Sequence, residues 1–233
     1  MRLVTLLFIM LPVLGFAGCV ATPKLGGPLP VRNQHPAQLT VMHLDPANTS
    51  VLPKGQTSWR IDQAYTSLFL SGINAQGTWF MDGEVLRSAI DTRIGLGNGL
   101  QFGMQLAGAH TSGGFLDDFI IDYHEALGLP DQDRDLSVNG RFMVDATKGG
   151  VSVWSVQKSS AELLDVPIHL TWQALEPGEQ RFGLALRGGI ELPTGDQDRG
   201  YGNGEVDVAL GAIVDYQAHG IGWNGHIQHT FAG

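Results

Sequence analysis

The chain has 233 residues, of which 16% are charged and 32 are glycine, and its formal net charge is −9. Because a phosphate-binding surface needs a basic patch and the sequence contains no cluster of Lys or Arg, we exclude nucleic acid as a partner. A mean hydropathy of +0.02 is too low for a bundle of membrane helices. It is compatible with a membrane barrel, in which only alternate residues face lipid.

The first residues have the pattern of an export signal. Met1 and Arg2 form a short basic region, and residues 3–17 are an apolar run. That run is shorter than the roughly 20 residues of a membrane-spanning helix and has the length of a signal-peptide core. We therefore predict a signal peptide over residues 1–21. No later apolar run approaches that length, so the mature protein is either soluble outside the cytoplasm or a membrane barrel.

The single cysteine, Cys19, directly follows the apolar run. The stretch from Phe16 to Cys19 resembles a bacterial lipobox, in which a small residue precedes a cysteine that becomes lipidated. Phe16 departs from the Leu that this pattern prefers. Ordinary cleavage after Ala17 or Ala21 fits equally, because both are small residues of the required kind. Lipid attachment at Cys19 and plain cleavage therefore both stay open.

Residues 22–37 are rich in Pro and Gly and show no periodicity. We predict an extended N-terminal segment here, which either tucks into a barrel interior or lies in the periplasm. Residues 37–44 are a weak strand candidate. We assign the remainder of the chain, residues 38–233, to one β-barrel domain.

Residues 84–107 carry the clearest strand signal. Apolar and polar side chains alternate over residues 84–96 and again over residues 100–107, which is the period of a strand with one apolar face. Between them lie Gly97, Asn98 and Gly99, which readily adopt the positive φ of a tight turn. The sequence therefore predicts a β-hairpin.

The same alternation recurs in further segments, at residues 59–69, 165–173, 181–191, 206–216 and 221–231. Their length matches the roughly 9–11 residues that cross a bilayer at a tilt, whereas typical globular strands have about 5–6. Short turns also alternate with long polar connections, at 111–138 and 193–204. We therefore predict an antiparallel transmembrane β-barrel of roughly 8–12 strands. Residues 141–146 and 151–156 are expected to form a hairpin that extends beyond the membrane.

One helix is predicted, over residues 115–127. Apolar side chains recur there at helical spacing, and Gly128 and Pro130 end the pattern. The strand count places this helix in an outer loop, where its apolar stripe is expected to cap the barrel mouth or fold into it.

Charged residues on the polar faces of the predicted strands are expected to point into the barrel, because charges are costly on a lipid-facing surface. They either pair with one another and plug a small barrel, or line an open conduit. These candidates are Arg60, Asp62, Arg87, Asp91, Arg93, Arg181, Arg187, Glu191, Asp207 and Asp215.

We find no strong metal, cofactor or catalytic signature. Asp131, Asp133 and Asp135 begin like a calcium loop, but the later positions lack the required Gly and Glu. We read them and the second acidic loop, at 196–198, as solvated charges, with a weak divalent-cation site near lipopolysaccharide as the alternative. His124 has no second His at zinc spacing. No cluster of Ser, His and an orienting polar group can be assembled. We therefore expect no metal, no cofactor and no enzyme activity.

Several segments stand out along the chain, at residues 27–36, 82–84, 110–119, 124, 128–130, 191–196, 198–200 and 202–204. Together they resemble a proteobacterial family of exported, uncharacterised proteins regarded as outer-membrane barrels. The resemblance spans roughly residues 27–210 and implies an outer-membrane location but no known activity. The Leu-Pro-Thr-Gly-Asp stretch is also similar to loops of barrel transporters grouped with aromatic-degradation pathways. Such barrels end on an aromatic residue, whereas this chain ends Phe231-Ala-Gly233, so we expect a truncated chain or an unusual assembly signal.

The charged inner face and long outer loops lead us to expect a passive pore or small-molecule conduit in the bacterial outer membrane. The first alternative is a plugged structural or interaction barrel that acts through its outer loops. The second is a lipid-modifying enzyme. Expected partners are outer-membrane lipid, lipopolysaccharide and the barrel-assembly machinery.

Overall fold

The protein is described by a computed structural model over residues 28–130, 133–134, 137–176, 182–218 and 221–233. The predicted signal peptide and Cys19 lie outside the described residues. Among those residues, no helix combines the length and apolar character needed to cross a membrane. The strands are β1 Thr57–Asn74, β2 Gly77–Gly97, β3 Leu100–Ser112, β4 Met143–Lys148, β5 Val151–Val156, β6 Ser160–Leu163, β7 Val166–Leu175, β8 Phe182–Leu192, β9 Asp207–Ala218 and β10 Ile221–Phe231. The helices are α2 Pro36–Leu39, α3 Asp117–Leu127 and the 3₁₀ turn η3 Gln197–Arg199.

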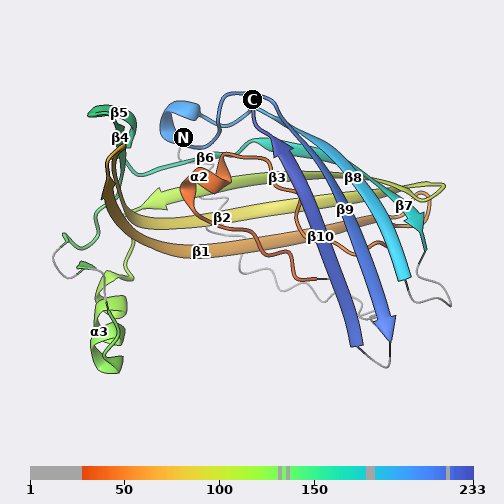
Figure 1. Ribbon diagram of the computed structural model, residues 1–233, viewed down its shortest axis with the longest axis horizontal. Coiled ribbons are helices and arrows are strands. Elements are labelled where there is room, and N and C mark those ends of the chain that lie inside the picture. Colours follow the sequence, from red (N-terminus) through yellow and green to blue (C-terminus); the bar gives the residue numbers. More distant parts are fainter. Residues whose placement is uncertain (1–27, 131–132, 135–136, 177–181, 219–220) are drawn as a thin grey trace.

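The strands form one antiparallel sheet that curls into a half-barrel (Figure 1). Its wall follows the order β1-β2-β3-β7-β8-β9-β10, so β1 and β10 are its edges. The structure confirms an all-β antiparallel fold with one short helix in a long loop. It also confirms the hairpin between β2 and β3, where Asn98 has a φ of 52° between two glycines with positive φ.

The wall has an extension at one end. β1 and β2 are 18 and 21 residues long, and only residues 84–97 of β2 pair with β3. The first residues of β2 pair instead with β4, and β4 pairs with β5. The hairpin predicted over residues 141–156 is therefore confirmed. In Figure 1, β1 and β2 bend sharply where this extension begins.

The two faces of the wall differ in chemistry. The convex face carries exposed large apolar side chains, among them Trp59, Ile61, Leu106, Leu170, Trp172, Leu186, Leu210, Trp223 and Ile227. The concave face carries polar and charged side chains together with small ones. The alternation that predicted the strands is therefore the alternation between these two faces.

The core lies between the concave face and the N-terminal part of the chain. Leu39 packs with a buried group of strand side chains that includes Val85, Ala89 and Ala107. Further along, Met42 and Leu44 pack with Ala209. The small inward residues leave room for this part of the chain, which Figure 1 shows inside the curl of the sheet.

Two predictions about local structure are wrong. Residues 37–44 form no strand, because they begin in α2, with Pro36 in its first turn, and continue as an irregular segment held by strand side chains. The helix predicted over 115–127 exists as α3, but it neither caps nor enters the half-barrel. The two residues just before its first turn, Phe115 and Leu116, are bound to Glu84, which lies on the convex face, so the helix projects outwards (Figure 1).

Candidate functional site

The most extensive polar site of the described chain lies where residues 39–53, here named the interior segment, cross the concave face. This segment has no strand partner, yet its backbone is hydrogen-bonded by strand side chains. The N–H of Met42 donates to Asp207 Oδ2 at 2.9 Å, and that of Thr49 donates to Asp215 Oδ2 at 2.6 Å. Because buried backbone groups need partners, these carboxylates take the place of the backbone hydrogen bonds that a neighbouring strand would supply.

Uncharged polar side chains also bind the backbone of the interior segment. The N–H of Leu44 donates to Gln228 Oε1 and that of Leu52 donates to Gln101 Oε1, both at 3.0 Å. In the other direction, Thr230 Oγ1 donates to the carbonyl of Met42 at 3.0 Å. The interior segment is therefore attached to β3, β9 and β10 through its own backbone.

Asp45 is the charged centre of the segment and is 8% exposed. Its Oδ2 accepts from Arg60 Nη2 at 2.9 Å and from Gln105 Nε2 at 3.2 Å. Its carbonyl accepts from Arg187 Nη1 at 2.6 Å. The positive charges of Arg60 and Arg187 beside it stabilise the ionised carboxylate. Asp45 is therefore an anion that draws β1, β3 and β8 towards the segment.

The charged residues predicted to point inwards all lie on this concave face, except Arg181, which is outside the described residues. Some pair with one another, as Arg93 Nε does with Asp91 Oδ1 at 2.8 Å and Arg60 Nε with Asp62 Oδ2 at 3.2 Å. Asp207, Asp215 and Arg187 bind the interior segment instead. Glu191 is 2% exposed and lies opposite Asp207 on the neighbouring strand. That these residues line a conduit stays a prediction.

The space left beneath the interior segment is small. A cavity between Asp45, Asp91, His169 and Arg187 has a volume of about 10 Å³, which is close to the space one water molecule needs. Gly189 shows how tightly the segment fits, since a Cβ there would lie 2.6 Å from Met42 Cε. At this level the concave face is filled by the chain itself.

Sequence reasoning missed the inward glutamines, asparagine and threonine that hold the segment. Gln101, Gln105, Asn224, Gln228 and Thr230 occupy the same strand positions as the charged candidates. Their signal was present, because each is a polar residue at an inward position of an alternating strand. Selecting inward residues by charge alone omits these uncharged polar side chains.

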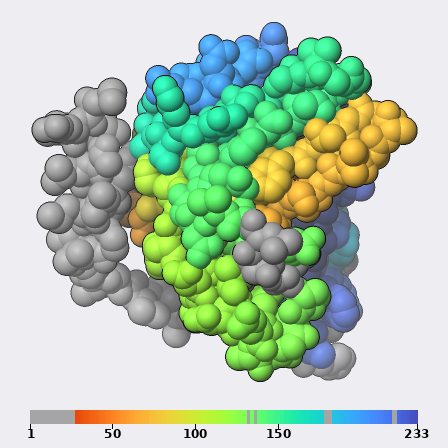
Figure 2. All heavy atoms as spheres, turned by 90° about the vertical axis from the view of Figure 1, so that its left-hand side faces the viewer, coloured from red at the N-terminus to blue at the C-terminus, as the bar shows by residue number. Residues whose placement is uncertain are grey.

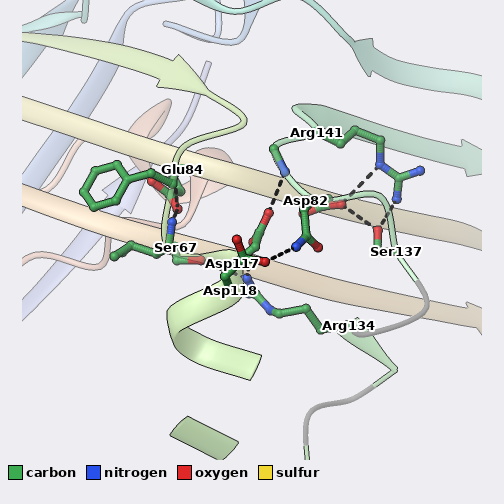
Figure 3. Close-up of polar contacts among 12 residues, drawn as sticks. Ser67, Asp82, Glu84, Asp117, Asp118, Arg134, Ser137 and Arg141 are labelled. Carbon is green, nitrogen blue, oxygen red and sulfur yellow. Dashed lines mark hydrogen bonds and ion pairs between the residues drawn. The ribbon is translucent and has the colours of Figure 1, made fainter. Parts of the chain in front are cut away.

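A second polar cluster lies on the convex side, where α3 begins (Figure 3). Glu84 is 1% exposed and accepts the N–H groups of Phe115 and Leu116 at 3.1 and 2.7 Å. The hydroxyl of Tyr65 donates to the same carboxylate. Gly114 has a φ of 73°, and a Cβ there would overlap the side chain of Glu84. The carboxylate of Glu84 therefore anchors the loop that precedes α3.

The neighbouring carboxylates act in the same way. Asp117 accepts from Arg134 Nη1 at 2.7 Å and from the N–H of Gly140 at 2.8 Å. Asp82 accepts from Arg141 Nε at 3.2 Å and from Ser137 Oγ at 2.9 Å. The segments 82–84 and 110–119, which are distant in sequence, are thereby brought together to order one loop region.

The loop after β8 is organised by a further buried carboxylate. Asp165 accepts the N–H groups of Gly195 and Asn203 at 2.7 and 3.3 Å. Tyr201 is 1% exposed, and its hydroxyl donates to the carbonyl of Ser160 at 2.7 Å. The glycine-rich motifs at 191–204 thus fold around buried hydrogen-bonding groups.

Two groups considered for metals have other partners here. Asp196 accepts the N–H of Arg199, and His124 Nδ1 lies 3.0 Å from the carbonyl oxygen of Pro130. Within the described ranges, no group of three His, Cys, Asp or Glu residues is placed to hold a metal ion. Asp131 and Asp135 lie outside those ranges.

Comparison with known proteins identifies a family. The family described as "Protein of unknown function (DUF3187)" matches residues 5–232. No curated protein matches the chain, and no solved structure matches it either.

Proposed function

The chain belongs to the DUF3187 family, whose function is not known, and on that premise we propose a role from its own geometry. The protein is an outer-membrane protein whose convex face contacts lipid and whose concave face is occupied by its own interior segment. It is a plugged structural or interaction barrel rather than an open pore. The observation that carries this proposal is the attachment of residues 42–52 to strands on both sides of the half-barrel.

The convex face supports the membrane location. Trp223 and Ile227 are 70% and 73% exposed, and similar side chains cover the strands beside them. Soluble monomers rarely expose a continuous apolar surface of this extent. The strands β7 to β10 are 10–12 residues long, which is close to the roughly 9–11 residues of a tilted transmembrane strand. The partners of this surface are outer-membrane lipid and lipopolysaccharide, and the barrel-assembly machinery would insert it.

A passive conduit is the second candidate, and the charge of the concave face favours it. Arg87, Asp91 and Arg93 lie on a polar surface of the kind that water-filled barrels display. Conduction would require the interior segment to leave this surface. That movement would break the buried bonds of Asp45, Asp207 and Asp215, so the plugged state is favoured at rest.

Current through a planar lipid bilayer tests the proposal. The native chain should insert and show little steady conductance. Replacing Asp45, Asp207 and Asp215 together by Asn removes the charges that hold the interior segment and should increase the frequency of open-channel currents. The control is Asp91→Asn, which removes one negative charge from the same face; Asp91 pairs with Arg93 and not with the segment.

Two results would contradict the proposal. A large steady conductance of the native chain that the triple variant leaves unchanged would favour the conduit. Failure of the chain to appear in the outer-membrane fraction, with no shift in gel mobility between heated and unheated samples, would contradict the membrane location itself.

A further inference from the structure

Helix α3 carries a row of apolar side chains that no part of the described chain covers. Phe115, Phe119, Tyr123 and Leu127 follow one another at intervals of four residues and are 75%, 66%, 50% and 57% exposed. Phe115 lies just before α3, and at 3.6 residues per turn the spacing of Phe119, Tyr123 and Leu127 places these three on one side of the helix. We name these four residues the α3 stripe. An exposed stripe of this kind is typical of a helix whose apolar side faces another phase.

The attachment of the helix directs the stripe towards the convex face of the sheet. The rings of Phe115 and Tyr65 stack with their centroids 5.5 Å apart. Tyr65 is exposed on the same side of β1 as Trp59 and Ile61. The stripe therefore begins, at Phe115, against the apolar convex surface and outside the half-barrel.

The helix begins where the wall of the half-barrel ends. Glu84, which binds the first turn of α3, lies opposite Ser67 of β1 and Ser112, the last residue of β3. Beyond this level β1 and β2 bend into the extension. Figure 1 shows the axis of α3 running across the direction of β1, β2 and β3, and Figure 2 shows this part of the chain as a lobe separate from the β1–β2 hairpin.

These observations define a depth and an orientation relative to a bilayer. If the strands cross the membrane, a helix that starts at their end and runs across them lies parallel to the membrane surface. Its aromatic stripe then meets the boundary between headgroups and acyl chains, where aromatic side chains are favoured. Asp118, whose carboxylate accepts a hydrogen bond from Asn139, and Glu125 are exposed and lie away from the stripe.

We infer that α3 is an interfacial helix that lies on the bilayer surface, with the α3 stripe inserted into lipid. The inference rests on the proposed function, because it needs the convex face to be in the membrane. In this arrangement the apolar side chains of α3 contact lipid instead of the barrel mouth. The helix would fix the depth of the barrel and hold the loop region anchored by Glu84 at the membrane surface.

Site-directed spin labelling of the full chain in phosphatidylcholine vesicles tests this inference. Single cysteines at Phe119, Tyr123 and Leu127 report on the stripe, and cysteines at Asp118 and Glu125 are matched controls on the other side. Labels on the stripe should collide more with oxygen, which concentrates in lipid, and less with a water-soluble nickel chelate. The controls should show the reverse. Equal and high accessibility to the nickel chelate at all five positions would overturn the inference.

Labels at Leu186 and Leu210, both exposed on the convex face, separate this inference from the proposed function. All variants carry Cys19→Ser so that one thiol is labelled. If the convex labels are in lipid and the stripe is in water, the interfacial helix is wrong and the membrane barrel stands. If the convex labels are also in water, the proposed function fails together with the inference.

Discussion

At the scale of single residues, Asp45 shows that the position of a carboxylate matters more for stability than its charge alone. Its buried carboxylate accepts from Arg60 and Gln105, so its removal leaves both donors without that acceptor, while the bond from Arg187 to the backbone carbonyl of residue 45 remains. We expect Asp45→Ala to lower the free energy of unfolding by about 2–4 kcal/mol, as removal of one partner from a buried ionic group does. Urea unfolding followed by tryptophan fluorescence, with the chain in vesicles, measures this value.

The control for that prediction is Asp62→Ala. Asp62 binds the same Arg60 through Nε at 3.2 Å, but it is more exposed and has no bond to the interior segment among the contacts described here. Its loss should cost less than about 1 kcal/mol. Equal destabilisation by the two substitutions would show that only the charge of Arg60 matters and would contradict the central role of Asp45.

Gly114 gives a second prediction at this scale, because a comparison with Gly128 separates the effect of positive φ from the effect of steric overlap. Both Gly114 and Gly128 have positive φ, but a Cβ at Gly128 meets no atom within 4 Å, whereas one at Gly114 overlaps Glu84. Gly128→Ala should therefore cost about 1 kcal/mol from backbone strain alone. Gly114→Ala should in addition displace Glu84 and release the start of α3. Faster hydrogen exchange over residues 113–128 in Gly114→Ala only is the expected result, and similar exchange in both variants would count against the anchor.

At the scale of elements, the strands could be predicted because their signal is local. Alternation along residues 100–107 or 182–191 is visible without knowing what either face touches. The interior segment could not be predicted in this way, because its bonds join positions 165 residues apart, as between Met42 and Asp207. Its residues have no period, since each one is held by a different strand.

Helix α3 shows the same limit on prediction from sequence. Its existence and its end at Gly128 followed from spacing and from the left-handed glycine, which has a φ of 64°. Its position did not, because an apolar stripe fits a barrel mouth as well as a bilayer surface. The deciding contact is that of Glu84 with the N–H groups of Phe115 and Leu116, which places the helix on the convex side. The sequence contains both partners but no indication that they meet.

At the scale of the whole molecule, the two edge strands of the sheet place the strictest requirement on a membrane location. β1 and β10 are both edges of the described sheet, and unpaired N–H groups are not tolerated in contact with acyl chains. The proposed function therefore requires that both edges are covered in the bilayer, either by each other or by another chain. The interior segment already spans the gap, since Leu44 binds β10 through Gln228 and the adjacent Asp45 binds β1 through Arg60.

Hydrogen exchange of the vesicle-embedded chain checks this requirement, and β5 supplies an internal control. β5 is also an edge strand, but it belongs to the extension beyond the level of Glu84, where water can satisfy its outward N–H groups. We expect the outward amides of β1, over residues 57–67, and those of β10 to exchange as slowly as central amides of β8, while those of β5 exchange quickly. Fast exchange of β10 at the rate of β5 would mean that this edge is in water. In that case the convex apolar face would need a covering other than the bilayer.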